Sequence, residues 1–382
     1  MLFKDSDNQR LREIRDSGKE ESLSKMKIGN LDLGHRAILA PMADVTDAPF
    51  RQICRENGAG LTFTQMISAK GVIENSFDTL KVLAFNRKEK PIGIQLLGRD
   101  AEYLEKAILE LKGLSPDLFD LNCGCSVMNV CKYGMGAAIL DEPLLLGKLV
   151  RTMVKAAGNI PVSIKIRLGR NRQKINVLEN ARIIEDNGAS FITVHGRTRS
   201  DSYQDEPLWD WIGKVKQTVS IPVVGNGSLF QADDCIKMID RTGCDSVFIA
   251  RGALGNPFIF NRLNSILDNG TDPGLQSVED VKRTSLHHLD LLVKDSGEEQ
   301  GVKKARKYFI WYFRFFNGVT ALLDKIFSLD NAAMVEEFIC SHVEKIKNGS
   351  YPEEDFEKIN RNFNERVLFW IVNTNQKEVD KQ

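Results

Sequence analysis

The stretch VSIKIRL at residues 162–168 alternates apolar and polar side chains along its whole length. Successive side chains of a strand point to opposite faces, so Ser163, Lys165 and Arg167 share one face and the apolar residues share the other. When the apolar face packs on helices, two cations point into the fold, where a charge is costly without an anion or strong acceptors. A bound anion explains both cations. The alternative is that Lys165 pairs with an interior carboxylate such as Asp120.

Seven further short runs are rich in Val, Ile, Leu and Phe, as expected of parallel strands buried on both faces. They are AILAPMA (37–43), LTFTQM (61–66), PIGIQLLG (91–98), LFDLNC (118–123), FITVHGR (191–197), IPVVGNG (221–227) and SVFIARG (246–252). Amphipathic segments lie between them, for example at residues 102–113, 143–158 and 177–188. Eight β-then-α units predict an α/β fold, a TIM (β/α)8 barrel, which we place at residues 26–265.

The chain after the barrel has a different pattern. Residues 267–277, LDNGTDPGLQS, are rich in Asp and Gly and indicate a linker. Residues 277–382 show helical periodicity, as in VEDVKRTSLHHLDLLVKD and VKKARKYFIWYFRFF, and predict an all-helical C-terminal domain. Residues 1–25 are charged and Ser-rich, which favours an N-terminal extension that is either a surface helix or disordered.

Composition limits the chemistry of the cysteines. The chain has 382 residues, 42% of them hydrophobic, with 52 basic and 52 acidic side chains, and neither a signal-like start nor a bilayer-length apolar run. We therefore expect a cytoplasmic protein with reduced thiols and no membrane association. Cys123, Cys125 and Cys131 cluster in DLNCGCSVMNVCKYGMGAAIL (120–140), but no fourth Cys or His lies at a zinc or iron–sulfur spacing. We therefore prefer the interpretation that one of the three thiols is reactive, that the other two take no part in the chemistry, and that no metal is bound.

The carboxyl ends of TIM-barrel strands face the active site, so the residues there are candidates for binding a ligand. The candidates are Pro41, Met42, Ala43, Gln95, Lys165, His195, Asn226, Gly227, Ser228, Ala250 and Arg251. The loops GNGSL and ARGALG follow two consecutive strands and contain glycine, as phosphate-binding loops of this fold commonly do. They predict a phosphate-bearing cofactor, and FMN fits. No P-loop or G-x-G-x-x-G is present. For His195 the alternative is a hydrogen-bonded core histidine.

Several motifs together resemble the dihydrouridine synthases, most closely the bacterial B-type branch, over about residues 26–320. They are LAPMADVTDAPFRQICRENGAG, QLLG, the cysteine stretch above, VSIKIRLG, VHGRTR, PVVGNGSL and ARGALGNPFIF. The resemblance implies that FMN, reduced by NADPH, reduces the C5–C6 double bond of a uridine in tRNA. Cys125 stands where the family has its cysteine in an Asn-x-Gly-Cys loop, which implies a general acid. Cys123 and Cys131 are then packing residues.

The resemblance also implies an RNA partner, tRNA or another structured RNA, for a monomeric enzyme. A uridine stacked in RNA must be flipped out to reach the barrel mouth. The residues expected to hold it are Asn122, Lys132, Arg167 and Arg197. A basic run of Lys303, Lys304, Arg306 and Lys307, followed by Trp311 and Tyr312, resembles the family's RNA-binding helix. A solvated helix face is the alternative.

Four positions depart from the family pattern. Ser126 replaces a usual Pro, Asn129 a Lys or Arg, Gln65 a Glu, and Tyr308 a His. Losing Pro loosens the Cys125 loop, and Asn129 removes a cation near the RNA. Three alternatives therefore stay open: a relative acting on another RNA, a catalytically silent RNA-binding relative, and a flavin barrel that reduces a free pyrimidine, as dihydroorotate dehydrogenases do. Cys125 argues against the silent relative, and the basic helical region argues against the free pyrimidine.

Overall fold

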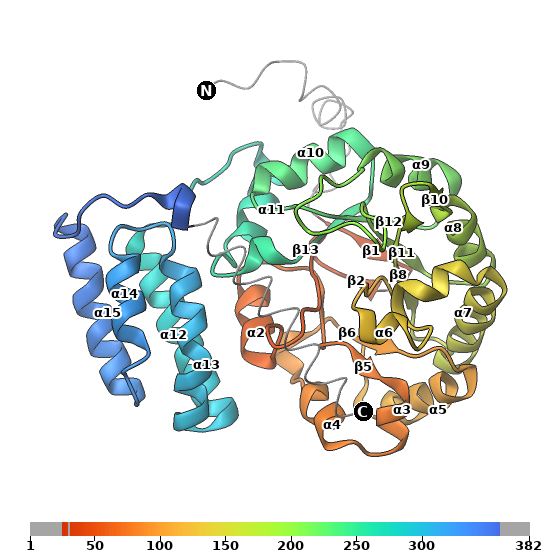
Figure 1. Ribbon diagram of the computed structural model, residues 1–382, viewed down its shortest axis with the longest axis horizontal. Helices are drawn as coiled ribbons and strands as arrows, with labels where there is room; N and C mark the ends of the chain where they lie inside the picture. The colour runs from red at the N-terminus through yellow and green to blue at the C-terminus, as the bar shows by residue number, and fades with distance from the viewer. Residues whose placement is uncertain (1–24, 30, 360–382) are drawn as a thin grey trace.

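The computed structural model describes residues 25–29 and 31–359. A barrel of strands surrounded by helices lies beside a smaller group of helices (Figure 1). The predicted extension at residues 1–25 lies outside the described residues except for Lys25, and so does the predicted helical domain beyond residue 359.

Within the described residues, eight parallel strands form the barrel, and each predicted run contains one of them. They are β3 (Ala37–Leu39), β4 (Thr62–Phe63), β6 (Ile92–Leu97), β7 (Leu118–Cys123), β8 (Val162–Arg167), β11 (Phe191–His195), β12 (Val223–Asn226) and β13 (Ser246–Ile249). The order around the ring is β3, β13, β12, β11, β8, β7, β6 and β4. A parallel bridge between Ile38 and Leu61 closes the ring. The predicted TIM barrel is confirmed.

Helices cover the outside of the barrel. The α-helices of this part are α2 (Ala48–Glu56), α3 (Ala69–Ile73), α4 (Phe77–Leu83), α5 (Ala101–Leu111), α6 (Met128–Cys131), α7 (Pro143–Ala157), α8 (Val177–Asp186), α9 (Asp210–Thr218), α10 (Ala232–Thr242) and α11 (Ile259–Asn269). Helix α5 shows why they form: Asp100 caps its first turn by accepting from the backbone N–H of Glu102 at 2.8 Å. Its buried residues, Leu104, Ala107, Ile108 and Leu111, recur at helical spacing.

Short elements complete this part of the chain. They are β1 (Lys27–Ile28), β2 (Leu31–Asp32), β5 (Ile67–Ser68), β9 (Gly169–Asn171) and β10 (Lys174–Ile175), with 3-10 turns η1 (Arg87–Glu89), η2 (Lys112–Leu114), η3 (Gly136–Asp141) and η4 (Arg251–Ala253). Met26, Ile28 and Leu33, in and beside the β1–β2 hairpin, pack with Phe63 and Phe248 in one apolar cluster. This cluster fills the amino-terminal half of the barrel interior and leaves the carboxyl ends of the strands for a site.

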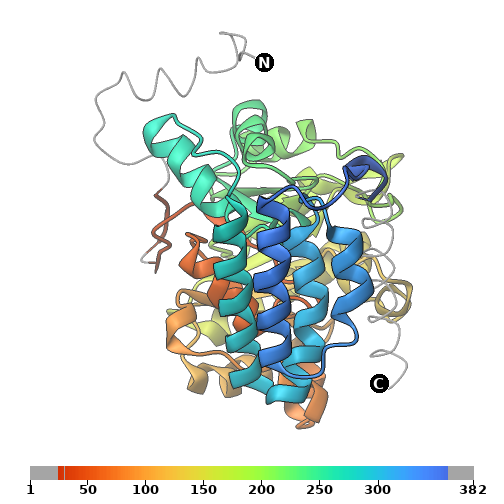
Figure 2. The ribbon, with the colours of Figure 1, turned by 90° about the vertical axis from the view of Figure 1, so that its left-hand side faces the viewer.

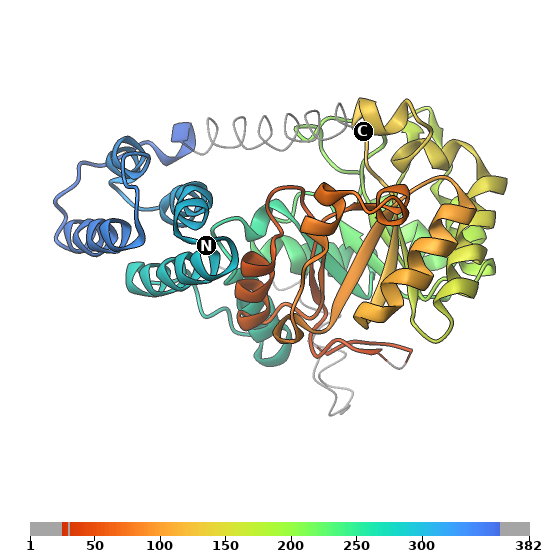
Figure 3. The ribbon, with the colours of Figure 1, turned by 90° about the horizontal axis from the view of Figure 1, so that it is seen from below.

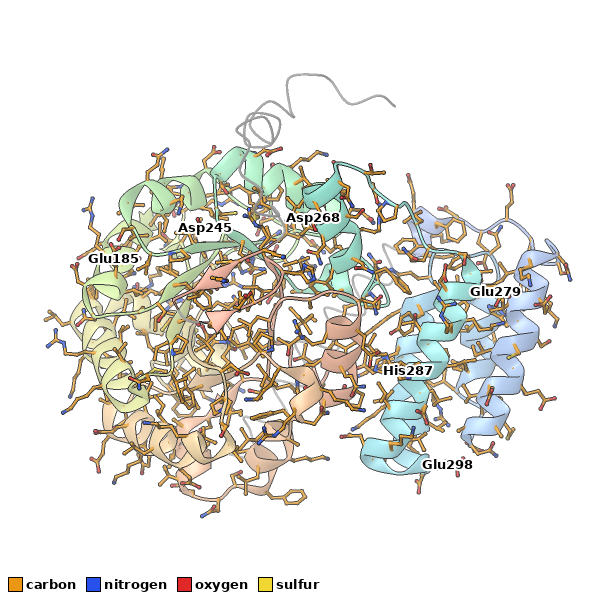
Figure 4. All side chains as sticks on the ribbon, turned by 180° about the vertical axis from the view of Figure 1, so that it is seen from behind. Glu185, Asp245, Asp268, Glu279, His287 and Glu298 are labelled. Atoms are coloured by element: carbon orange, nitrogen blue, oxygen red, sulfur yellow. The ribbon has the colours of Figure 1, made fainter. Side chains whose placement is uncertain are left out.

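The C-terminal part is helical, as predicted. It contains α12 (Val278–Ser296), α13 (Glu298–Phe313), α14 (Val319–Ile326) and α15 (Ala332–Lys347), which run side by side (Figure 2). Helices α12 and α13 lie next to α2 of the barrel (Figure 3). His287 of α12 faces the barrel, with its Nε2 atom 3.0 Å from Glu56 Oε2 of α2 (Figure 4). No helix in residues 25–29 or 31–359 is long and apolar enough to cross a membrane.

Candidate active site

A cavity of about 680 Å³ lies at the carboxyl ends of the barrel strands. All eleven residues predicted to bind the cofactor line it, from Pro41 to Arg251, together with Asn122, Cys125, Arg167 and Arg197. The parallel register explains why residues distant in sequence meet here: Asn122 of β7 and Thr193 of β11 both lie opposite Lys165 of β8. The volume is in the range of small-molecule sites.

Sequence reasoning missed several apolar residues that line the same cavity, namely Met66, Met128, Tyr203 and Phe230. Tyr203 comes from the loop after β11. Its ring stacks on His195, with the centroids 6.3 Å apart, and lies 5.7 Å from the Arg167 guanidinium and 5.0 Å from that of Arg251. The only signal in the sequence was a lone aromatic residue among polar neighbours after a strand end.

Lys165 lies on the inner face of β8, as its alternation predicted. Its ammonium has no hydrogen-bond acceptor and no ion-pair partner among the described residues. Burial and nearby Arg167 together lower its pKa to about 8, against the opposing effect of Asp120. The direct Lys165–Asp120 ion pair is therefore not formed. A Cβ atom on Gly124 would lie 3.3 Å from Lys165 Nζ, so the glycine leaves room for this ammonium.

The Asp120 carboxylate instead starts a hydrogen-bonded chain across three strands. Ser163 Oγ donates to Asp120 Oδ1 at 2.5 Å, and Gln95 Nε2 donates to Asp120 Oδ2 at 2.7 Å. Asn122 Nδ2 then donates to Gln95 Oε1 at 2.9 Å. Finally, Asn122 Oδ1 accepts the backbone N–H of Cys125 at 2.8 Å. The Asp120 carboxyl at one end thus orients two amides, and the second amide fixes the loop of Cys125 at the other end.

The three clustered cysteines have different surroundings. Cys125 lines the cavity, and burial raises the pKa of its thiol, so the thiol stays protonated at neutral pH. Cys123 is fully buried in the apolar core between strands and helices, where burial raises its pKa as well. Cys131 lies beside the cavity, and its thiol donates to the Cys125 carbonyl at 3.4 Å. Of these three, Cys125 is the thiol that lines the cavity.

Two arginines at the mouth tie loops together. Arg167 donates through Nε to the Gly124 carbonyl at 2.8 Å and through Nη1 to the Thr198 carbonyl at 2.7 Å. Arg197 donates to two carbonyls of its own loop and to Ser228 Oγ at 2.8 Å. Both side chains are buried.

The imidazole of His195 is neutral. Its burial is the main cause that holds its pKa well below its usual range, and the neighbouring cations, Arg167 and Lys165 first among them, lower the pKa further.

The loops after β12 and β13 are packed tightly against each other. Gly227 has a φ of 132°, and a Cβ atom there would lie 3.3 Å from His195 Cδ2. A Cβ atom on Gly252 would collide with the Leu229 carbonyl. Beside these loops the Arg251 guanidinium lies between the rings of Tyr203 and Phe230, 5.0 Å from each centroid. Like Lys165, it has no carboxylate or hydrogen-bond partner in the described part of the chain.

The remaining predicted RNA contacts lie outside this cavity. Lys132 Nζ sits 5.1 Å from the Tyr133 ring centroid. On α13, Lys303 pairs with Glu299 at 2.6 Å and Lys304 with Asp295 at 3.5 Å. The two other cations of the run, Arg306 and Lys307, donate to the carbonyls of Leu329 and Asp44, and Arg306 also pairs with Asp330.

Burial of two aromatic residues limits how this helix can contact RNA. The aromatic residues that follow the basic run, Trp311 and Tyr312, are only 6% and 2% exposed, so they are not available to stack on RNA. They are buried because their face of α13 packs on the other helices and on the barrel. The run also has acids close to it in space, although it contains none in sequence.

The departures from the family pattern are accommodated locally. Gln65 Oε1 accepts the Asp44 N–H at 2.7 Å, and the Tyr308 hydroxyl donates to the Val45 carbonyl at 2.7 Å. Ser126 lines the cavity next to Cys125.

No group of three or more His, Cys, Asp or Glu side chains suited to a metal ion occurs within the described residues.

The fold and this cavity define a (β/α)8-barrel enzyme with buried cations and a protonated thiol at its mouth. The family model described as "Dihydrouridine synthase (Dus)" matches residues 38–348, and the chain belongs to this family. It is thereby an FMN-dependent oxidoreductase.

Curated relatives agree with this assignment, and a solved structure has a similar fold. The chain is 36% identical to tRNA-dihydrouridine synthase B of Pseudomonas aeruginosa over 78% of this chain and 89% of that protein. It is 37% identical to tRNA-dihydrouridine synthase B of Pseudomonas syringae pv. tomato over 78% and 88%. Histamine dehydrogenase from Rhizobium sp. 4-9 is similar in structure, with a TM-score of 0.51 at 14% identity over 71% of this chain and 51% of that one. This last likeness shows the fold alone.

Proposed function

We propose that this protein reduces the C5–C6 double bond of a uridine in tRNA to dihydrouridine, with FMN bound at the barrel mouth, NADPH as the reductant and Cys125 as the general acid. One observation carries the proposal. Two cations, Lys165 and Arg251, line the same cavity as a protonated thiol, and neither has a carboxylate or hydrogen-bond partner among the described residues. Cations of this kind require an anionic ligand, and the thiol provides a proton next to it.

The residues of the cavity fit FMN. Arg251 and the tightly packed loops after β12 and β13 would hold its phosphate, because a guanidinium and close backbone approach suit a phosphate. Lys165, Gln95, His195 and the segment Pro41–Met42–Ala43 would contact the remainder of the cofactor. A neutral His195 can donate or accept a hydrogen bond there without adding a fifth positive charge to the cations Lys165, Arg167, Arg197 and Arg251.

When bound, FMN supplies the hydride that C6 of the uracil receives. The chain supplies the proton for C5. The raised pKa of Cys125 keeps its thiol protonated until it donates, and the backbone N–H of Cys125 is fixed by Asn122. Arg167 fixes the neighbouring Gly124 carbonyl. The protein thus holds a neutral acid in a fixed place beside the base.

The partner in this proposal is tRNA, bound by a monomeric enzyme in the cytoplasm. The barrel at residues 26–265 is the catalytic domain, and residues 277–382, whose described helices are α12 to α15, are the RNA-binding domain. Asn122, Arg167 and Arg197 surround the flipped base, and Lys132 meets the RNA backbone outside the cavity. The exposed lysine Lys303 and its neighbour Lys304 contact phosphates by exchanging their present carboxylate partners.

The test has two measurements. The purified protein should show a flavin absorbance spectrum, and Lys165→Met should abolish it while Lys106→Met, which removes an exposed lysine of α5, should not. Dihydrouridine is then measured in tRNA from cells with and without the gene. A protein that takes up no FMN contradicts the cofactor assignment. Unchanged dihydrouridine in tRNA, with the flavin present, contradicts the substrate.

A further inference from the structure

The loop after β3 is held by side-chain donors from helices α2 and α13. This loop lines the cavity through residues 41–43, and its next three carbonyls, those of Asp44, Val45 and Thr46, all accept side-chain hydrogen bonds. The donors are Lys307 Nζ, the Tyr308 hydroxyl at 2.7 Å and Arg51 Nη1 at 2.7 Å, in that order. Two of these three donors come from α13 of the helical part.

The conformation of this loop needs such support. Asp44 has a φ of 56°, in the left-handed region that non-glycine residues seldom adopt. Its N–H donates to Gln65 Oε1 at 2.7 Å, and its carbonyl accepts from Lys307. Side chains therefore hold both the N–H and the carbonyl of the one non-glycine residue of this loop with a positive φ, directly after the residues that line the cavity.

Tyr308 and Lys307 are placed for this role rather than for a surface role. Tyr308 is 1% exposed, and its ring stacks on Phe50, with the centroids 5.6 Å apart. The Tyr308 ring also contacts the His288 ring, with the two centroids 4.3 Å apart. Lys307 Nζ lies 5.1 Å from the Tyr308 ring and 5.9 Å from the Trp311 ring, and burial lowers its pKa. The Tyr308 hydroxyl is buried, and the ammonium of half-buried Lys307 donates to the Asp44 carbonyl.

Helix α13 also touches a second loop of the cavity. Gly255, in the loop after β13, has a φ of 61°, and a Cβ atom there would collide with the Trp311 backbone. Strands β3 and β13 are neighbours in the barrel. The helix therefore supports two adjacent loops, one that carries Met42 and one that follows Arg251.

We infer that Lys307 and Tyr308 are positioning residues for the cofactor site: by binding the Asp44 and Val45 carbonyls they hold residues 41–46 in the conformation that receives FMN. The inference rests on the proposed function for the identity of the ligand. It assigns Lys307 to the cofactor site instead of to the RNA. It also makes α13 the element through which the helical part and the cofactor cavity affect each other.

Tyr308→Phe tests the inference because it removes one hydroxyl from a ring that stays packed. The matched control is Tyr312→Phe, since the Tyr312 hydroxyl contacts His288 of the same helical part, at 3.3 Å. FMN affinity is measured by fluorescence titration of the flavin-free, full-length protein. Tyr308→Phe should bind FMN about 3- to 30-fold more weakly, because the Val45 carbonyl loses its partner. Backbone amides of residues 41–47 should exchange hydrogen faster in the same flavin-free variant.

Lys307 provides a second pair of variants. Lys307→Met should weaken FMN binding, and Lys307→Arg, which keeps a donor for the Asp44 carbonyl, should restore most of it. Equal FMN affinity and equal amide exchange in Tyr308→Phe and Tyr312→Phe would overturn the inference. Failure of the wild type to bind FMN would instead count against the proposed function, and the amide exchange of residues 41–47 in the flavin-free protein would still decide the positioning role.

Discussion

Asp120 and Gln95 are joined by a 2.7 Å hydrogen bond in which the amide of Gln95 is the donor. The other oxygen of the same carboxyl accepts from Ser163, so both of its oxygens take part in hydrogen bonds. Gln95 in turn accepts from Asn122, and Asn122 accepts the backbone N–H of Cys125. The order of the thiol loop therefore depends on a carboxyl of β7, the strand that leads into this loop, acting through Gln95 of the neighbouring strand β6.

Asp120→Asn should slow the reduction of uridine about 10- to 100-fold, because an amide cannot accept from both Gln95 and Ser163 and the Cys125 loop then loses its fixed geometry. The measurement is single-turnover reoxidation of pre-reduced enzyme by uridine-containing tRNA. Asp117→Asn is the control, since Asp117 accepts a backbone N–H at the opposite end of the barrel, from Ile92 at 2.9 Å. Equal rates in the two variants would contradict the role of the hydrogen-bonded chain.

The same carboxyl makes stability depend on pH. Burial, opposed by Ser163, Gln95 and Lys165, raises the pKa of Asp120 to about 7. A pKa above that of the unfolded chain means that the folded state binds the proton more tightly, so the wild type loses this stabilisation as pH rises from about 4 to about 7. Asp120→Asn cannot ionise. Its free energy of unfolding relative to wild type should therefore rise over that interval in urea titrations at several pH values.

The strand pattern was enough to find most of this cavity. The period of two placed Ser163, Lys165 and Arg167 on the inner face, and the rule that parallel strands end on one side of the barrel brought the predicted residues together. Tyr203 was not found, because its loop has no period and its position follows from stacking on His195 and from contact with two arginines.

The packing of helix α13 could not be predicted for a different reason. Its four cations suggested a solvated, phosphate-binding face, but a helical period identifies which residues share a face and not what covers that face. Tyr308 and Trp311 pack against loops of the barrel that are far away in sequence. Contacts of this kind are set by tertiary packing, which sequence spacing does not encode.

The buried ion pair between Arg51 and Glu89 should contribute strongly to stability. Arg51 Nε lies 2.6 Å from Glu89 Oε2, with the side chains 1% and 0% exposed. Glu89→Ala leaves an unpaired buried guanidinium and should lower the free energy of unfolding by about 3–5 kcal/mol. Urea unfolding followed by circular dichroism gives this value. Glu102→Ala, which breaks an exposed pair with Lys106 on α5, should leave the unfolding curve unchanged.

Charge reversal on α13 tests the RNA surface separately from the cofactor site. Lys303→Glu combined with Lys304→Glu should weaken tRNA binding, and the dependence of log affinity on log salt should fall by about 0.7–0.9 for each phosphate that is no longer neutralised. FMN affinity should stay the same, because neither lysine touches a cavity loop. The control reverses Lys106 and Lys237, two paired lysines of α5 and α10. If both double variants bind tRNA equally well, the phosphates are bound elsewhere on the protein.

Cys125 and Cys131 can be separated by one assay, because both thiols lie near the cavity but only Cys125 lines it. Cys125→Ala should bind FMN and accept hydride from NADPH as the wild type does, yet its reoxidation by tRNA should slow by about two to four orders of magnitude, the usual cost of losing a general acid. Cys131→Ala loses only a hydrogen bond to the Cys125 carbonyl and should slow far less. Because burial raises the pKa of Cys125, the wild-type rate should stay level up to at least about pH 8.5, where a free cysteine is half ionised. A rate that falls with the ordinary ionisation of a thiol, or a Cys131→Ala variant that stalls while Cys125→Ala turns over, would assign the proton to a different donor.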